Sequence, residues 1–312
     1  AHSVFALAQP ELASKPNNAQ RSAMTEARSI LHNVSWLSGA QLVVRIAQLA
    51  AYASLTRRLG EVGFGRFAYA FSLLDMVAFL ATLGLPILYT RHVAAGRHEH
   101  AAAAVVAKHR LTTVVTFLGM VWLWIAPPKL MLDLLIMMFL AMLLRGYHLF
   151  GASGLRGKER MDEEALASVA GRLAFALLAG GGVWLTDAPS AMLRITFVAF
   201  LVGEIITVIL TNRAMLRHGL SWSPSTPSLS SRQSVFKEML PFAAAGLMGA
   251  IAFRIDLVML RELSPPLIGE MHAGTYGVAY RILESGLFLP AAVGAALFPA
   301  LVRLGRGQTL PR

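Results

Sequence analysis

Long apolar runs separated by short polar segments make up the chain from about residue 30 onward. Most of these runs are about 20 residues long, which is the length that an α-helix needs to cross a bilayer. The run 111–126 is shorter, and the alanine-rich residues 101–107 before it would extend it to a full crossing. The pattern predicts an all-α integral membrane protein with about eight transmembrane helices, at residues 31–55, 64–88, 111–126, 130–150, 165–186, 192–211, 239–263 and 274–302.

The polar segments indicate how the chain is organised. Residues 1–29 have no apolar core before a cleavage site, so they predict a cytoplasmic tail and not a signal peptide. The chain begins with Ala1, whereas Met24 resembles a natural start, so we expect residues 1–23 to be non-native or a disordered tail. The basic, alanine-rich residues 91–110 predict a loop or an interfacial helix.

A serine- and proline-rich segment at residues 212–237 has the composition of a linker. It falls after the sixth predicted span, where a boundary between two halves of a transporter is expected. We therefore expect an N-terminal lobe at residues 30–211 and the start of a second lobe at residues 238–312.

An internal repeat supports this division into lobes. A shift of about 209 positions places Gly65-Arg-Phe-Ala-Tyr-Ala-Phe on Gly274-Thr-Tyr-Gly-Val-Ala-Tyr. The same shift places Arg45 on Arg254 and Asp75 on Glu284. Two apolar hairpins, each with a basic and an acidic residue at matched positions, are typical of transporters built from related halves.

Composition and charge agree with a membrane protein and exclude other classes. The chain is 56% hydrophobic and 14% charged, and its mean hydropathy is +0.58. Soluble domains carry about 25% charged residues. The net charge of +11 does not indicate nucleic-acid binding, because the basic residues form no continuous stripe. The chain has no cysteine and no pair of histidines with ligand spacing on an apolar face, so we expect no disulfide, metal or other cofactor.

The distribution of basic residues predicts the orientation in the membrane. Of the 28 lysines and arginines, 17 lie in the N-terminal tail and in the loops after every second span, and 6 lie on the opposite side. Because cytoplasmic loops carry the excess of basic residues, we expect a cytoplasmic N-terminus. The repeat also predicts that the chain is a fragment, since two equal lobes would need twelve or more spans and about 440 residues.

Charged residues inside the predicted spans are the candidate functional groups, because a charge at the bilayer centre costs at least about 2.5–3.5 kcal/mol. Arg45 and Asp75 are expected at similar depth on adjacent antiparallel helices, where they could pair, and Arg254 and Glu284 repeat this arrangement. Arg281 shares a helical face with Glu284, three positions later.

The remaining candidates follow from depth and spacing. Glu204 is expected to lie at the depth of Arg172, with which it could pair. Asp256 is two positions from Arg254, so the two should face different sides of their helix. Arginines from both lobes would line a central cleft that suits an anionic group, above all a diphosphate. The candidates for this lining are Arg45, Arg254, Arg281, Arg172 and Arg91, and those for ion pairing or coupling are Asp75, Asp256, Glu284 and Glu204.

Several short segments resemble a known family. The residues Arg57-Arg-Leu-Gly-Glu-Val-Gly-Phe-Gly-Arg-Phe67, Gly84-Leu-Pro86 and Arg91 resemble the start of Wzx-type polysaccharide flippases of the multidrug/oligosaccharidyl-lipid/polysaccharide exporter superfamily. Residues 254–260, 275–284 and 297–301 resemble the seventh and eighth spans of that family.

The resemblance implies a MATE-like, two-lobed helix bundle in the bacterial inner membrane. It implies a flippase that translocates undecaprenyl-diphosphate-linked oligosaccharide, such as an O-antigen or exopolysaccharide repeat unit used in lipopolysaccharide, through a basic lumen. Membrane lipid, the lipid-linked oligosaccharide and the polysaccharide polymerase or export machinery would be its partners.

Two other functions remain open at this point. A MATE-type cation-coupled drug or metabolite antiporter would have the same fold but an acidic lumen, and Asp75, Asp256 and Glu284 keep that function open. A membrane polymerase or ligase would need catalytic groups in a sizeable outer loop, and the predicted outer loops are short and have no nucleophile–base pair. We therefore expect no enzymatic activity.

Overall fold

The computed structural model describes residues 18–125, 132–222 and 226–286, with side chains from about residue 42 onward. Within these residues the chain forms nine helices and no strand, which confirms the all-α prediction. The helices are α1 (Asn18–Leu80), α2 (Leu85–Ala94), α3 (His98–Ile125), α4 (Leu132–Gly157), α5 (Met161–Gly182), α6 (Pro189–Arg217), α7 (Leu229–Ala252), α8 (Ile255–Glu262) and α9 (Pro266–Gly286).

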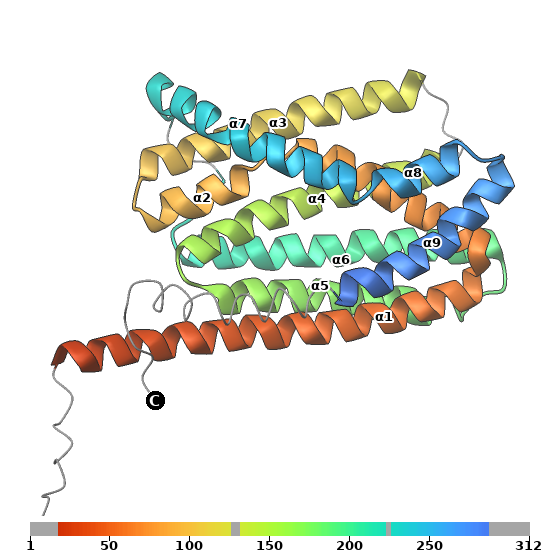
Figure 1. The fold of residues 1–312 in the computed structure, drawn as a ribbon, viewed down its shortest axis with the longest axis horizontal. Helices are drawn as coiled ribbons and strands as arrows, with labels where there is room; N and C mark the ends of the chain where they lie inside the picture. Colours follow the sequence, from red (N-terminus) through yellow and green to blue (C-terminus); the bar gives the residue numbers. More distant parts are fainter. Residues whose placement is uncertain (1–17, 126–131, 223–225, 287–312) are drawn as a thin grey trace, which may run out of the picture.

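Helix α1 contains the first predicted span and most of the second. It turns sharply at Gly60, where φ is 67° and ψ is 179°, and the second arm runs back along the bundle (Figure 1). That backbone conformation is open only to glycine. The second span was predicted to reach residue 88, but the helix ends at Leu80, and α2 starts after Gly84, which is left-handed with φ of 76°. Pro86 in the first turn of α2 lacks the N–H needed to continue the preceding helix.

Several predicted boundaries were wrong by a few residues to a full turn or more. Most of residues 91–110, predicted as a loop or an interfacial helix, are helical, because α2 ends at Ala94, α3 begins at His98, and alanines are strong helix formers. The predicted extension of the third span by residues 101–107 is confirmed. Helix α6 extends beyond both ends of its apolar run, α4 continues past the end of its run to Gly157, and α5 begins before its run at Met161 and ends at Gly182. Within the predicted linker 212–237, α6 continues to Arg217 and α7 begins at Leu229, where Ser228 caps the helix.

The seventh predicted span, 239–263, is interrupted. Helix α7 ends at Ala252, and α8 begins at Ile255, so Arg254 lies at the break between them. Six helices of the described chain are long and apolar enough to cross a membrane, so the count of eight spans stays a prediction. Residues 1–17 of the tail and residues 287–312, which include most of the eighth predicted span, lie outside the described residues.

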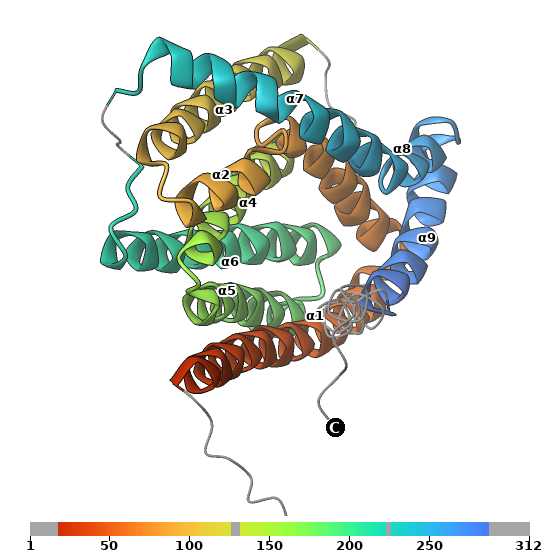
Figure 2. The ribbon, with the colours of Figure 1, turned by 60° about the vertical axis from the view of Figure 1, so that its left-hand side comes forward.

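The helices form two groups around a shared centre. Helix α5 lies between the first arm of α1 and α6, while α2, α3 and α7 lie on the far side of α4 (Figures 1 and 2). Helix α9 crosses α1 near its Gly60 turn. A cluster of buried phenylalanine rings joins α1 to α5 and α6, with Phe67 edge-on to Phe197 at 5.6 Å between ring centroids. This packing fixes the helices that surround the site.

Candidate functional site

A charged cavity of about 860 Å³ lies at the centre of the described bundle. Both arms of α1 line it, together with α4, α5, α7, the α7–α8 break and α9. Six arginines and three carboxylates of the described chain face it, so its lining is predominantly cationic. These residues are Arg45, Arg145, Arg156, Arg172, Arg254 and Arg281, with Asp75, Glu164 and Glu284.

Arg254 holds the carboxylates of both repeat units. Its Nε atom lies 3.1 Å from Oδ2 of Asp75, and its Nη1 atom lies 2.9 Å from Oε1 of Glu284. Arg281 donates to the other oxygen of Glu284 at 2.8 Å. The predicted pairing of Glu284 with Arg254 and with Arg281 is therefore confirmed. The helix break places Arg254 between α1 and α9, where it reaches both acids.

The predicted Arg45–Asp75 pair is wrong. Asp75 is taken by Arg254, and Nε of Arg145 lies 3.9 Å from its second oxygen. Arg45 lines the cavity with its Nε atom buried and without a hydrogen-bond partner. The repeat placed the two residues at similar depth, but the arginine of the other repeat unit is nearer to the carboxylate. Arg45 is thereby left with hydrogen-bonding capacity that faces the cavity.

A further carboxylate, that of Glu204, holds cavity-lining arginines of α4 and α5. Oε1 of Glu204 on α6 accepts a hydrogen bond from Nη1 of Arg172 on α5 at 2.9 Å, which confirms the predicted pair. Arg145 on α4 lies 3.6 Å from the same oxygen. Sequence reasoning missed Arg145 as a cavity residue, although an arginine within the apolar run 130–150 was a signal for it.

Aromatic rings support the guanidinium groups. The ring of Phe71 lies within 4.2 Å of the Arg281 guanidinium carbon, 5.2 Å of that of Arg254 and 5.7 Å of that of Arg145. Tyr52 adds a second face for Arg281 at 5.0 Å. Cation–π contacts of this kind fix a planar guanidinium without consuming its N–H donors. No signal in the sequence distinguished Phe71 from the other phenylalanines.

Two predicted site residues lie elsewhere. Arg91 on α2 is 61% exposed, and its nearest carboxylate is Glu238 of α7, at 3.7 Å. It does not line the cavity, because the break before α2 moves it to the surface near the α2–α3 turn. Asp256 accepts a hydrogen bond from the hydroxyl of Tyr276 and does not line the cavity, which agrees with its predicted separation from the face of Arg254.

A second ion-pair network closes the bundle near the Gly60 turn. Glu270 of α9 accepts a hydrogen bond from Nε of Arg66 on α1 at 3.0 Å and lies 3.6 Å from Arg261 of α8. Arg261 and Glu270 are both buried. The hydroxyl of Tyr69 on α1 donates to Glu262 at 2.7 Å. These contacts tie α1 to α8 and α9 at one end of the molecule.

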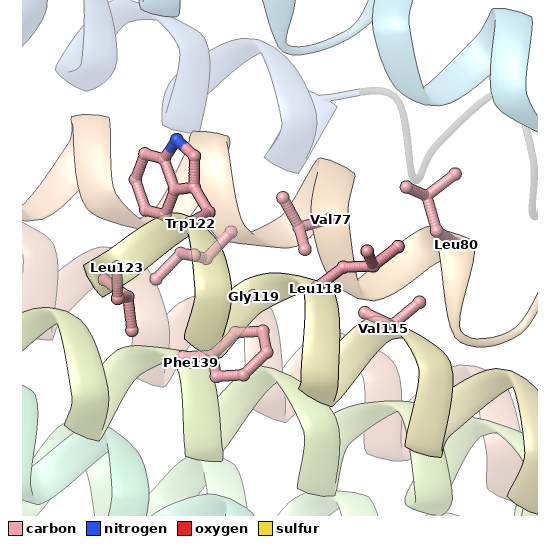
Figure 3. Close-up of a pocket in the computed structure, with 9 residues that line it drawn as sticks. Val77, Leu80, Val115, Leu118, Gly119, Trp122, Leu123 and Phe139 are labelled. Atoms are coloured by element: carbon pink, nitrogen blue, oxygen red, sulfur yellow. The ribbon is translucent and has the colours of Figure 1, made fainter. Parts of the chain in front are cut away.

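A smaller apolar pocket of about 210 Å³ lies on the other face of the second α1 arm. Leu74 lines this pocket, whereas the next residue, Asp75, faces the charged cavity. Figure 3 shows Val77 and Leu80 of α1 opposite α3, with the ring of Phe139 below. Among the described residues, no group of three histidine, aspartate or glutamate side chains could hold a metal ion.

Comparison with known proteins gives a family match and a fold match. The model of the family described as polysaccharide biosynthesis protein matches residues 30–305. A crystal structure of MATE in complex with MaL6 superposes with a TM-score of 0.51 and 15% identity, covering 88% of this chain and 71% of that chain. A crystal structure of a MATE mutant gives a TM-score of 0.47 and 16% identity over the same shares. No curated protein sequence matches significantly. The first structural similarity shows a MATE-like fold.

Proposed function

Because the chain belongs to the polysaccharide biosynthesis protein family, we propose that it is a flippase for undecaprenyl-diphosphate-linked oligosaccharide in the bacterial inner membrane. The family and the fold indicate a multi-pass membrane transporter of the flippase and exporter type and not a catalytic enzyme. The substrate, its direction of movement from the cytoplasmic to the periplasmic leaflet, and the alternating-access mechanism are parts of the proposal.

The cationic cavity is the observation that supports this function. A diphosphate carries its negative charge on oxygens that a guanidinium can hold through two parallel N–H donors. Arg45, Arg254 and Arg281 project into the cavity from α1, the α7–α8 break and α9. A cavity of about 860 Å³ falls within the range of ligand sites and admits a charged headgroup. The lipid tail would remain in the bilayer.

Arg45 is the residue best placed to receive the phosphate. Arg254, Arg281 and Arg172 are already engaged with carboxylates, whereas Arg45 keeps a buried Nε without a partner. A buried donor without an acceptor costs about 1–3 kcal/mol, and an anionic ligand would recover this free energy on binding.

The cation-coupled antiporter is supported less well. Cationic substrates need carboxylates that are available to them. In the described part of the cavity each carboxylate already has an arginine partner, since Asp75 pairs with Arg254, Glu284 with Arg281, and Glu164 with Arg156 at 3.0 Å. An acidic lumen is therefore not what the lining provides.

The first prediction concerns Arg45. We expect Arg45→Ala to lower translocation about 10- to 100-fold, the loss expected for removal of hydrogen bonds to a charged group. The measurement is transfer of a lipid-diphosphate bearing a fluorescent oligosaccharide across proteoliposomes that contain the full-length protein. Arg45→Lys keeps the charge without the paired donors, so its translocation rate should lie between those of Arg45→Ala and the unmodified protein.

Arg194→Ala is the matched control, because Arg194 is exposed and lies outside the cavity lining, beside Asp133. It should transport at the rate of the unmodified protein. Arg45→Ala breaks no ion pair of the described structure, so its effect is not confused with misfolding. Unchanged translocation by Arg45→Ala would rule out the proposed phosphate contact.

A further inference from the structure

A buried histidine between α2 and α7 has no role in the cavity. His92 is 0% exposed, and neither of its ring nitrogens has a hydrogen-bond partner. Its Nε2 atom lies 3.7 Å from Oε2 of Glu238, an oxygen that is also buried and without a hydrogen bond. Buried polar groups are hydrogen-bonded in the great majority of cases, so three such atoms in one contact need an explanation.

Polar and charged groups on α2, α7 and α3 surround the His92–Glu238 pair. Arg91 on α2 lies 3.7 Å from the same Glu238 oxygen, and Ser234 donates to the other oxygen at 3.0 Å. The ring of His100 on α3 lies 5.2 Å from the ring of His92, and Arg97 is the remaining charged neighbour. Burial lowers the pKa of His92 below its ordinary value of 6.5, and the Glu238 carboxylate opposes that shift while His100, Arg97 and Arg91 add to it.

The helices that carry the pair are already in close contact nearby. A Cβ atom on Gly84, just before α2, would lie 2.7 Å from Cβ of Phe242 on α7. A gap of 3.7 Å between nitrogen and oxygen is about 1 Å longer than a charge-assisted hydrogen bond, which is about 2.7–2.9 Å. A small movement of α7 toward α2 would therefore be enough to make that bond.

We propose that His92 and Glu238 form a proton-binding site, in which protonation of Nε2 creates a salt bridge that draws α7 onto α2. In the present arrangement Nε2 lies too far from the carboxylate to donate a hydrogen bond to it. Proton uptake places the positive charge beside the partly buried Glu238 carboxylate, whose buried Oε2 atom then gains a hydrogen-bond partner. The site takes a proton as its ligand, so it does not depend on the identity of the transported lipid.

The sign of the pH dependence tests the proposal. When a salt bridge forms, the folded state binds the proton more tightly than the unfolded state, and the stability gain is present below the ordinary histidine pKa. A ring that keeps the lowered pKa of the present arrangement, and so stays neutral in the folded state, gives the opposite sign. Acidification then costs stability, because the unfolded chain takes up a proton that the folded chain does not.

The experiment measures the thermal midpoint of the full chain in detergent micelles at pH 8 and at pH 5. We expect the unmodified protein to gain about 2–4 °C relative to His92→Gln on acidification, which corresponds to roughly tenfold tighter proton binding in a chain of this size. Glu238→Gln removes the other partner of the contact, so it should abolish the same gain in thermal midpoint on acidification. His98→Gln, at an exposed histidine of α3, should leave it unchanged.

Three results would overturn the proposal. A relative loss on acidification would mean that His92 stays neutral, and no difference would mean that the pair is inert. A gain that persists in Glu238→Gln would assign the proton to another partner. Size-exclusion profiles at pH 8 check that each variant is folded. Because no result depends on transport, a failure here is distinct from a failure of the proposed flippase activity.

Discussion

At the scale of single residues, carboxylates decide which arginines remain available. Glu204 is 2% exposed and sits between Arg172 and Arg145, so it balances two partly buried guanidinium groups. Asp75 and Glu284 together balance the charge of Arg254. Charges buried in this way are tolerated only when they are paired. Ion pairs therefore offset the charge of five of the six described cavity arginines, and Arg45 is the one without a carboxylate partner within the described residues.

We predict that Glu204→Gln destabilises the protein by about 3–5 kcal/mol, because removing one partner leaves buried positive charge without compensation. The thermal or denaturant-induced unfolding of the protein in micelles measures the loss. Asp187→Asn removes a carboxylate that is 96% exposed and pairs with Arg58, and it should have no measurable effect. Adding Arg172→Gln to Glu204→Gln should recover part of the loss, and full additivity of the two changes would contradict the pairing.

At the scale of elements, breaks in the helices place the functional side chains. The Gly60 turn folds α1 back on itself, so that Arg45 on one arm and Asp75 on the other line one cavity. The interruption after Ala252 puts Arg254 at a helix end, within reach of α1 and α9. Irregular backbone at membrane depth is tolerated where it lines a cavity, and the break at Arg254 fits that rule.

We predict that Gly60→Ala costs about 1–3 kcal/mol of stability, because its φ of 67° and ψ of 179° are strained for any residue with a Cβ atom. A Cβ atom at Gly60 would meet nothing within 4 Å, so any loss reports the backbone and not a clash. Gly181→Ala in α5 is the control, since it too has open space but an ordinary helical backbone. Equal thermal midpoints for the two variants would refute the argument from backbone strain.

At the scale of the whole molecule, α1 and α9 cross through two glycines that the repeat places in register. A Cβ atom on Gly65 would collide with the carbonyl oxygen of Glu270, and one on Gly274 would collide with the carbonyl oxygen of Glu61. Glu61 and Glu270 are separated by the same offset as the two glycines. This reciprocal contact is what a two-fold relation between the repeat units produces. The Arg66–Glu270 ion pair lies beside it.

We predict that Gly65→Ala and Gly274→Ala each destabilise the protein by about 1–3 kcal/mol, because backbone cannot move aside as a flexible side chain can. The double variant should lose less than the sum, since the first change already separates the two helices. Gly286→Ala, at the end of α9 with open space around it, is the control. Thermal unfolding in micelles gives all four values. A loss for Gly65→Ala no larger than for Gly286→Ala would argue against the tight crossing.

The sequence by itself determined the helical membrane class, the family resemblance and the paired charges, because apolar length and buried charge are visible without coordinates. The pairs Arg254–Glu284, Arg281–Glu284 and Arg172–Glu204 followed from depth and helical spacing. Helix ends were predicted less well, since alanine-rich and charged residues continue a helix beyond its apolar run.

Only the tertiary structure decided which arginine Asp75 pairs with and which arginines line the cavity. Depth along a helix does not specify rotation about its axis or which of several neighbours is nearest, so Asp75 pairs with Arg254 and not with Arg45. For the same reason the sequence did not identify Arg145 and Phe71 as cavity residues. It also wrongly predicted that Arg91 lines the cavity, whereas Arg91 lies at the surface. Pairing between distant segments depends on how the helices pack, and that is a property of the folded chain as a whole.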